Sequence, residues 1–246
     1  MTTFALVHGA WHGAWCWERL APLLKQAGHD VVTPDLPCDD ASATTFEPYA
    51  DIVCAALGGR DDDVVVVGHS LAGPTATLVA ARRPVRHLVY LCGAVPSAGR
   101  SLIDQRTEQP DMCNPHWDKG ISAPDEHLRL TWTDLDAARE LLFGDCDEAT
   151  VMSAFQRLRL QCAHPFIAPF PLAEIPTTPC TSVICTEDQM VYPQWQRRIA
   201  REIGAEIVEL PGSHSPQLSR PSAVAEVLLR VAGESQAVDA SLAPLG

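Results

Sequence analysis

The chain has 246 residues, of which 46% are hydrophobic and 20% are charged, and its formal net charge is −13. This length suits one α/β domain with a sizeable core, and the apolar content excludes a disordered chain. No run of Lys and Arg exceeds two residues, and this pattern, together with the negative charge, argues against nucleic-acid and anionic-membrane partners.

The cysteines and the N-terminal residues indicate the cellular compartment of the protein. Nine cysteines, an odd number without a paired spacing, indicate free thiols in a reducing compartment. The N-terminal apolar run is short and has no basic region before it, unlike a secretory signal peptide. No apolar stretch reaches the roughly 18 residues that a membrane span requires. We therefore expect a cytoplasmic protein with no membrane partner.

Short apolar runs alternate with helical periodicity along most of the chain. The expected strands are 4–7, 31–32, 64–67, 88–91, 182–185 and 205–208. The expected helices are about 15–26, 49–56, 71–83, 195–203 and 222–231. Several strands are apolar at nearly every position, as in strands that are covered on both faces. The alternation predicts an α/β fold with a doubly wound, mostly parallel sheet of about six strands.

The alternation stops between residues 96 and 179. This stretch shows two helical patterns, at 132–142 and 148–160, and no convincing strand. We expect a helical lid at 96–179, inserted into a core that residues 1–95 and 180–246 form. A lid would cover a pocket at the strand ends, where α/β sheets bind ligands. The candidate substrate-binding residues of this segment are Trp117, Trp132 and Phe166, although an aromatic satellite core would give the same pattern.

The sharpest motif follows the valine run at 64–67, where Gly68-His69-Ser70 leads into a helical stretch. In a nucleophile elbow, a tight turn between strand and helix holds a serine in a strained conformation and projects its hydroxyl from the sheet. The usual pattern is G-x-S-x-G, whereas this chain has Ala72 at the fifth position and Gly73 one place later. We predict that Ser70 is a nucleophile.

A serine hydroxyl needs a base, and the base needs an orienting carboxylate. In this kind of fold the chain order is serine, acid, histidine. Two predicted strands end just before Glu187-Asp188 and just before His214, at the same sheet edge as Ser70. We predict His214 as the base and favour Asp188 over Glu187, because the shorter side chain is better held in a strand-end turn. His69 adjoins the nucleophile but is expected to point elsewhere on the tight turn.

The oxyanion that serine attack generates requires hydrogen-bond donors placed in advance. One predicted donor is the backbone N–H of Leu71, directly after the nucleophile. The second is the backbone N–H of Ala10, in the glycine-containing loop that follows the first strand. The same loop offers Trp11 and His12 as candidate substrate-binding residues.

A metal pair is the alternative interpretation of His8 and His12, which lie four residues apart. That spacing suits a helix, but Gly9 and Gly13 favour a loop, and no Glu follows His8. The chain also has no glycine-rich nucleotide-binding motif. We expect no metal and no cofactor.

Taken together, these motifs resemble the α/β-hydrolase fold. The resemblance is closest to the small, lidded group of plant-type methylesterases and hydroxynitrile lyases, with its bacterial esterase relatives. It is carried by Leu6–Trp15 with Leu23, Leu24, Gly28 and His29, by Gly68–Leu71, by Cys185–Asp188, and by Gly212–His214 with Leu218 and Pro221. The resemblance implies that Asp188 is the acid of a Ser-His-Asp triad.

Two positions separate esterases from lyases within this group. The lyases carry a threonine after the first histidine of the oxyanion loop, where this chain has Gly9. They also carry a lysine after the triad histidine, where this chain has Ser215. Both departures from the lyase pattern imply ester hydrolysis.

The sequence therefore predicts a serine hydrolase that cleaves a carboxylic ester of a small, fairly apolar substrate through an acyl-enzyme. One alternative is an enzyme of secondary metabolism that forms or opens lactones or transfers acyl groups with the same triad. Another is a ligand-binding receptor of the same fold with weak catalysis, because fold alone does not decide function. Whether the chain forms a homodimer stays open.

Overall fold

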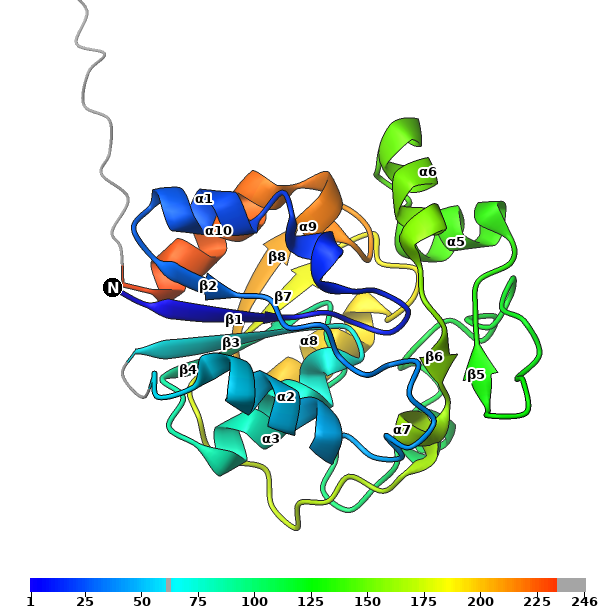
Figure 1. Ribbon diagram of the computed structural model, residues 1–246, viewed down its shortest axis with the longest axis horizontal. Helices are drawn as coiled ribbons and strands as arrows, with labels where there is room; N and C mark the ends of the chain where they lie inside the picture. Colours follow the sequence, from blue (N-terminus) through cyan, green and yellow to red (C-terminus); the bar gives the residue numbers. More distant parts are fainter. Residues whose placement is uncertain (61–62, 234–246) are drawn as a thin grey trace, which may run out of the picture.

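The computed structural model describes residues 1–60 and 63–233. Its centre is a six-stranded sheet in the order β2-β1-β3-β4-β7-β8, in which every neighbouring pair is parallel (Figure 1). The strands are β1 (Thr3–Val7), β2 (Asp30–Val32), β3 (Val64–His69), β4 (His87–Leu91), β7 (Cys180–Cys185) and β8 (Glu206–Leu210). The predicted α/β fold with about six strands is confirmed.

Helices cover both faces of this sheet. They are η1 (Ala14–Trp17, a 3-10 turn), α1 (Ala21–Gln26), α2 (Glu47–Leu57), α3 (Ala72–Arg82), α8 (Pro193–Glu202), α9 (Pro216–Ser219) and α10 (Pro221–Val231). α1 and α10 lie together on one face, and α2 and α3 lie together on the other (Figure 1). The single helix expected over 15–26 is wrong, because η1 and α1 are separate. Pro22 lacks a backbone N–H and fits only the first turn of a helix, so α1 starts beside it.

Burial explains why the strands have their sequence patterns. Every residue of β1 and β3 is buried, as their continuous apolar runs predict for strands with helices on both faces. β2 and β8 form the two edges, and their residues are half-buried or exposed. The central strands therefore supply a rigid base, and the loops at their carboxyl ends carry the polar motifs.

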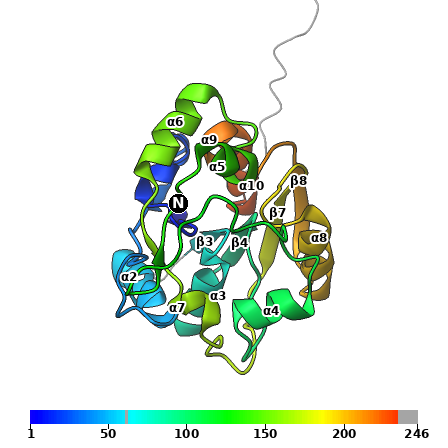
Figure 2. The ribbon, with the colours of Figure 1, turned by 90° about the vertical axis from the view of Figure 1, so that its right-hand side faces the viewer.

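The helices and strands of residues 96–179 lie at the carboxyl ends of the sheet strands, and the chain then returns to the opposite edge, where β7 begins (Figure 1). These elements are α4 (Leu102–Glu108), β5 (Arg129–Leu130), α5 (Leu135–Leu142), α6 (Glu148–Arg157), β6 (Gln161–Cys162) and α7 (His164–Ile167). Figure 2 looks onto this edge of the sheet, with α4 and α7 on one side of β3 and β4 and with α5 and α6 on the other. The division into a core and an inserted lid stays a prediction, and residues 234–246 of the predicted core lie outside the described residues.

Two details of this segment correct the sequence analysis. The expectation of no strand is wrong, because β5 and β6 pair antiparallel; two residues each are too few to give an alternating pattern. The prediction missed α4, which begins at a capping box in which the Ser101 hydroxyl accepts a hydrogen bond from the Asp104 amide at 3.0 Å. α5 starts three residues later than expected, where Asp134 caps it.

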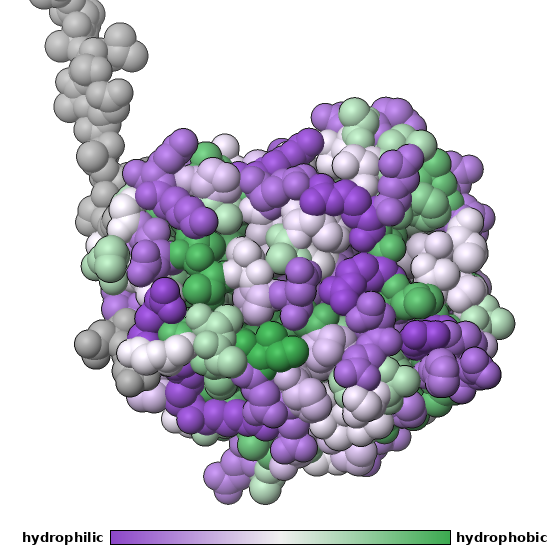
Figure 3. Space-filling model, viewed as in Figure 1, coloured by the Kyte–Doolittle hydropathy of each residue, from purple (hydrophilic) through white to green (hydrophobic). Residues whose placement is uncertain are grey.

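The outer surface is mostly polar on the face drawn in Figure 3, where apolar residues form small separate patches. All nine cysteines fall within the described residues and are free thiols. Among the described residues, we find no helix with the length and apolar character needed to cross a bilayer.

Candidate active site

The turn between β3 and α3 holds Ser70 in an unusual backbone conformation. Its φ angle is +52°, in the left-handed region that residues other than glycine rarely adopt. The Ser70 N–H donates to the Leu91 carbonyl at 3.1 Å. The Ser70 carbonyl accepts hydrogen bonds from the N–H groups of Gly73 at 3.2 Å and Ala94 at 3.0 Å. Contacts with the neighbouring strand β4 and the loop after it therefore maintain the strained turn.

Two glycines let the helix approach the strand at this turn. A Cβ atom on Gly68 would lie 2.7 Å from the Ala72 carbonyl oxygen, and one on Gly73 would lie 1.9 Å from the Ala94 carbonyl oxygen. By contrast, the Ala72 methyl is accommodated in the interior. The departure from the G-x-S-x-G pattern has a steric reason, since the close backbone approach falls at Gly73, one place later.

The structure brings Ser70, His214 and Asp188 together. His214 Nε2 lies 2.8 Å from Ser70 Oγ, and His214 Nδ1 lies 2.9 Å from Asp188 Oδ2. The three residues follow β3, β8 and β7, and parallel strands end at one edge of the sheet. Because a carboxylate can only accept, Nδ1 carries the hydrogen and Nε2 accepts from the serine hydroxyl. His214 and Asp188 are each 1% exposed, whereas Ser70 is half-buried and faces the cavity.

The carboxylate beside His214 belongs to Asp188 and not to Glu187, which is exposed. Asp188 Oδ1 accepts hydrogen bonds from the backbone N–H groups of Met190 at 2.8 Å and Val191 at 3.0 Å. These bonds hold the short side chain inside its own turn. They leave Oδ2 of the same carboxyl group to contact the imidazole of His214.

Gln196 completes the hydrogen bonding around this carboxylate, and the sequence analysis missed it. Its Nε2 donates to Asp188 Oδ2 at 3.1 Å and to the Val191 carbonyl at 2.8 Å. The side chain is buried on α8, on the same face as Ile199 and Ala200. A polar residue on an apolar helix face is the signal that could have indicated it.

The His69 imidazole contacts the backbone of His214. Its Nε2 donates to the His214 carbonyl at 2.9 Å, and the two ring centroids lie 5.2 Å apart. Burial lowers the pKa of His69, and the neighbouring His214 and His12 lower it further, so the ring stays neutral. As the sequence analysis expected, the imidazole does not point at Ser70, but it contacts the backbone that carries the predicted base.

Asp145 fixes the turn just before His214, and nothing in its local sequence indicates this role. Its Oδ1 accepts from the Ser213 N–H at 3.1 Å and from the Ser213 hydroxyl at 2.5 Å, while Oδ2 accepts from Arg220 Nε at 3.0 Å. Gly212 has a φ angle of +124°, and a Cβ atom there would lie 2.5 Å from Asp145 Oδ2. The connection between α5 and α6 therefore stabilises the loop that follows β8.

Ser70 opens into a cavity of about 740 Å³, a volume that includes its open mouth. Four of the predicted substrate-binding residues line it, namely Trp11, His12, Trp117 and Phe166. Trp132 does not line the cavity; it packs edge-on against Trp11, with ring centroids 5.7 Å apart. The remaining wall is mainly aliphatic, so the cavity suits an apolar ligand.

The two predicted oxyanion donors also line this cavity. Within residues 1–60 and 63–233, the backbone N–H groups of Ala10 and Leu71 donate no hydrogen bond to another protein group. The loop that carries Ala10 lies against the serine, because a Cβ atom on Gly9 would lie 2.9 Å from Ser70 Cβ. The wall of the cavity that holds the serine hydroxyl thus contains two backbone N–H groups without a hydrogen-bond acceptor among the described residues.

The imidazoles of His8 and His12 make separate bonds within the loop. His8 Nδ1 contacts the Gly9 carbonyl at 2.9 Å and its Nε2 accepts from the Leu36 N–H at 2.9 Å, while His12 Nδ1 contacts the Ala10 carbonyl at 2.7 Å. Burial lowers the pKa of His8 to about 4 and that of His12 to about 3. Both rings are neutral at pH 7 and stabilise the loop that presents the Ala10 amide.

A different group has metal-ligand spacing. Ligand atoms of Cys92, Asp188 and His214 all lie within 4.8 Å of one another and are buried. Among the described residues, no such group includes His8 or His12. A cation bound there would have to replace the hydrogen bond between Asp188 and His214, so these residues suit proton transfer better than metal binding.

Comparison with known proteins identifies the family. The model of the alpha/beta hydrolase family matches residues 4–227, and the chain therefore belongs to this family. A pyrethroid hydrolase of Sphingobium wenxiniae is 29% identical over 248 residues, covering 93% of this chain and 86% of that protein. Methylesterase 7 of Arabidopsis thaliana is 25% identical over 256 residues, covering 93% and 95%.

A solved structure supports the same grouping. The pyrethroid hydrolase from Sphingobium faniae JZ-2 superposes with a TM-score of 0.81 at 25% identity, covering 94% of this chain and 97% of that chain. The resemblance to plant methylesterases and bacterial esterases, inferred from the motifs, is confirmed.

Proposed function

We propose that the protein is a serine esterase that cleaves a carboxylic ester of a small, largely apolar substrate. The observation that carries this proposal is the chain of contacts from Ser70 Oγ through His214 to Asp188, at 2.8 and 2.9 Å. The names of its relatives, a pyrethroid hydrolase and a methylesterase, support an ester as the substrate class.

In the proposed reaction, His214 Nε2 takes the hydroxyl proton while Ser70 Oγ attacks the ester carbonyl carbon. The carbonyl oxygen becomes an oxyanion, which accepts hydrogen bonds from the backbone amides of Ala10 and Leu71. Asp188 stabilises the imidazolium. The bond to the alcohol oxygen then breaks, and His214 returns the proton to the leaving alcohol. Water repeats the sequence on the acyl-enzyme and releases the acid.

Gly9 supports hydrolysis over cyanohydrin cleavage. A Cβ atom at this position would lie 2.9 Å from Ser70 Cβ and 3.0 Å from His69 Nδ1. The threonine found there in hydroxynitrile lyases would therefore require Ser70 or His69 to move. Ser215 follows His214 and offers no positive charge for a departing cyanide.

We infer further that residues 96–179 act as a lid over the site. Trp117 and Phe166 from this segment line the cavity, and their rings stack with centroids 6.5 Å apart. Apolar walls exclude water around the reacting groups and strengthen the hydrogen bonds to the oxyanion. The lid thus contributes both shape and a low dielectric.

A fluorophosphonate probe and a series of p-nitrophenyl esters test this function. Wild-type protein should be labelled and should turn over short to medium acyl chains. Ser70→Ala should lose labelling and about 10⁴- to 10⁶-fold in rate. Retained activity in that variant would refute the nucleophile. Ester formation with an added alcohol would instead indicate acyl transfer, and tight binding with negligible turnover would indicate a receptor.

A further inference from the structure

Arg106 on α4 is the one Lys or Arg among the described residues that line the cavity, and no Asp or Glu lines it. Its side chain is half-buried, and its guanidinium carbon lies 4.8 Å from the centroid of the Trp117 ring. Burial raises the pKa of the adjacent Cys113 thiol, and the Arg106 charge opposes that rise. Since Trp117 and Cys113 also line the cavity, the positive charge itself lies in the wall.

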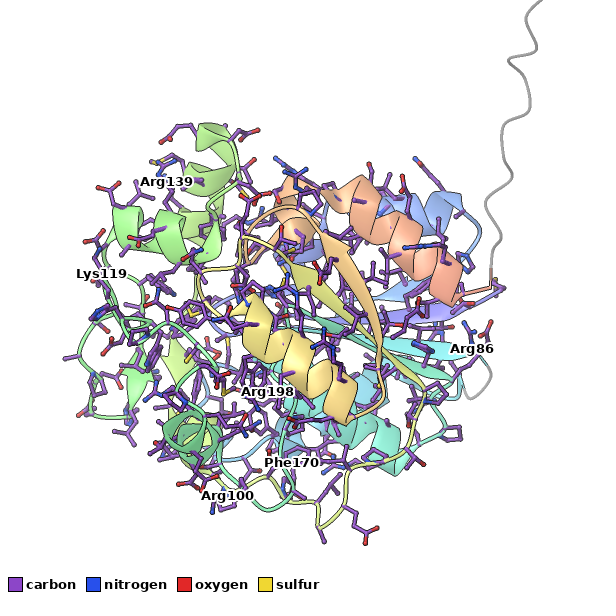
Figure 4. All side chains as sticks on the ribbon, turned by 180° about the vertical axis from the view of Figure 1, so that it is seen from behind. Arg86, Arg100, Lys119, Arg139, Phe170 and Arg198 are labelled. Atoms are coloured by element: carbon purple, nitrogen blue, oxygen red, sulfur yellow. The ribbon has the colours of Figure 1, made fainter. Side chains whose placement is uncertain are left out.

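The carboxylates nearest to Arg106 in the chain are committed to other partners. Asp104 accepts from the Ser101 hydroxyl at 2.7 Å in the capping box, and Glu108 pairs with Arg100. Asp111 accepts two hydrogen bonds from Arg198 of α8, at 2.8 and 3.0 Å. Arg100 and Arg198, labelled in Figure 4, thus pair with the two acids that follow Arg106 in the chain, Glu108 and Asp111. Within residues 1–60 and 63–233, no carboxylate forms an ion pair with Arg106.

A guanidinium that has no carboxylate partner among the described residues, and that lies in an apolar wall, calls for a physical explanation. The chain has 31 acidic residues and only 18 basic ones, so acids are not scarce. The face of Trp117 stabilises the charge in part through a cation–π contact. A carboxylate would stabilise it further, because a guanidinium presents parallel N–H donors that match two carboxylate oxygens.

We propose that Arg106 binds a carboxylate carried by the substrate, at a distance from the ester group. The preferred substrates are then esters with an apolar body and an anionic end, such as monoesters of dicarboxylic acids. This inference rests on the proposed esterase function and adds a specificity-determining residue to it. Arg106 contacts no reacting atom in this proposal and is not catalytic.

Matched esters test the inference. Mono-p-nitrophenyl esters of adipic, pimelic and suberic acid carry a terminal carboxylate, and p-nitrophenyl hexanoate, heptanoate and octanoate are their neutral partners. We expect the ratio of kcat/KM, anionic over neutral, to be highest at the chain length that spans from Ser70 to Arg106. Arg106→Gln should lower that ratio by about 10- to 100-fold, mainly through KM, and Arg106→Lys should lower it less.

Arg100→Gln is the matched control, because it removes a charge near the same helix that Glu108 already neutralises. It should leave the ratio within about twofold of the wild type. Raising the salt concentration should compress the ratio in wild type but not in Arg106→Gln. Equal ratios in wild type and Arg106→Gln at every chain length would overturn the inference, while turnover of neutral esters would leave the esterase function standing.

A binding measurement tests the anion site separately from the esterase function. Calorimetry with monomethyl suberate on Ser70→Ala, and on Ser70→Ala combined with Arg106→Gln, requires no turnover. Binding that weakens about 10-fold or more in the double variant supports the anion site even if the wild type hydrolyses nothing. Equal binding by both variants, or binding by neither, counts against the anion site.

Discussion

The loops at the strand ends of the sheet and the segment 96–179 build the site in different ways. The strand-end loops hold polar groups at fixed positions through backbone hydrogen bonds, as Ser70 and Asp188 illustrate. The segment contributes side chains from short helices and, at Trp117, from a turn, and these shape the cavity through ring contacts and a single charge. The comparison suggests that the reaction depends on the first region and the choice of substrate on the second. Variants in each region test this division.

After loss of the nucleophile itself, the largest effect is expected from Asp188→Asn, since an amide would no longer hold His214 in the productive tautomer. We expect kcat to fall about 10³- to 10⁴-fold. The exposed neighbour gives the matched control, and Glu187→Gln should retain activity within about twofold. Steady-state kinetics with one p-nitrophenyl ester compares the two. A comparable loss in both variants would contradict the assignment of the carboxylate.

Gly9→Ala should give the next largest effect. Its Cβ atom would lie 2.9 Å from Ser70 Cβ, so either the nucleophile or the oxyanion loop must shift. Displacements on this scale reduce kcat by about 10²-fold in well-oriented sites. Gly59→Ala is the control, because nothing lies within 4 Å of a Cβ atom there. Unchanged kcat in Gly9→Ala, with unfolding also unchanged, would mean that the site tolerates the methyl group.

Trp117→Ala tests the second region. It removes a half-buried aromatic wall of the cavity, so KM for medium-chain esters should rise about 10-fold with little change in kcat. Trp132→Phe, behind the wall, should change KM less. A large fall in kcat for Trp117→Ala would instead give the segment a part in the chemical step.

A final prediction concerns stability instead of catalysis, namely the stability of the oxyanion loop as the pH falls below 6.5. The folded-state pKa values of His8 and His12, about 4 and about 3, lie below the ordinary value of 6.5. Their contribution to stability is therefore complete above pH 6.5, and it is lost as pH falls from 6.5 toward these values. For each pH unit by which the pH falls within that window, each ring lowers the free energy of unfolding by about 1.4 kcal/mol.

Urea unfolding between pH 7 and pH 4.5 measures this slope. His12→Asn keeps a side-chain N–H near the Ala10 carbonyl but removes the titrating ring. The slope of the unfolding free energy against pH should therefore decrease by up to the amount that one bound proton contributes. An exposed histidine, His116, provides the control, and His116→Asn should leave the slope unchanged. An identical slope in wild type and His12→Asn would contradict the assigned burial of this imidazole.

Much of the fold and of the candidate site could be predicted from local sequence. The valine run before Gly68, Ser70 and the following helix form one continuous strand-turn-helix unit, so a local pattern is enough to describe it. His214 and Asp188 were found because each follows a strand, and parallel strands converge at one edge. Within 96–179, by contrast, β5, β6 and α4 have two to seven residues and give no clear periodicity.

Local sequence is enough to indicate which side chains lie at the ends of the strands, because hydrophobic periodicity and tight-turn chemistry act over a few neighbouring residues. Tertiary packing alone brings Gln196, His69 and Asp145 into contact with the histidine, its carboxylate and the turn before it. It also decided that Trp132 stands behind the cavity wall and that Arg106 stands in it. These contacts join residues far apart in the chain. A single element shows at most that a polar residue lies on an apolar face, as Gln196 does, and not which group that residue contacts.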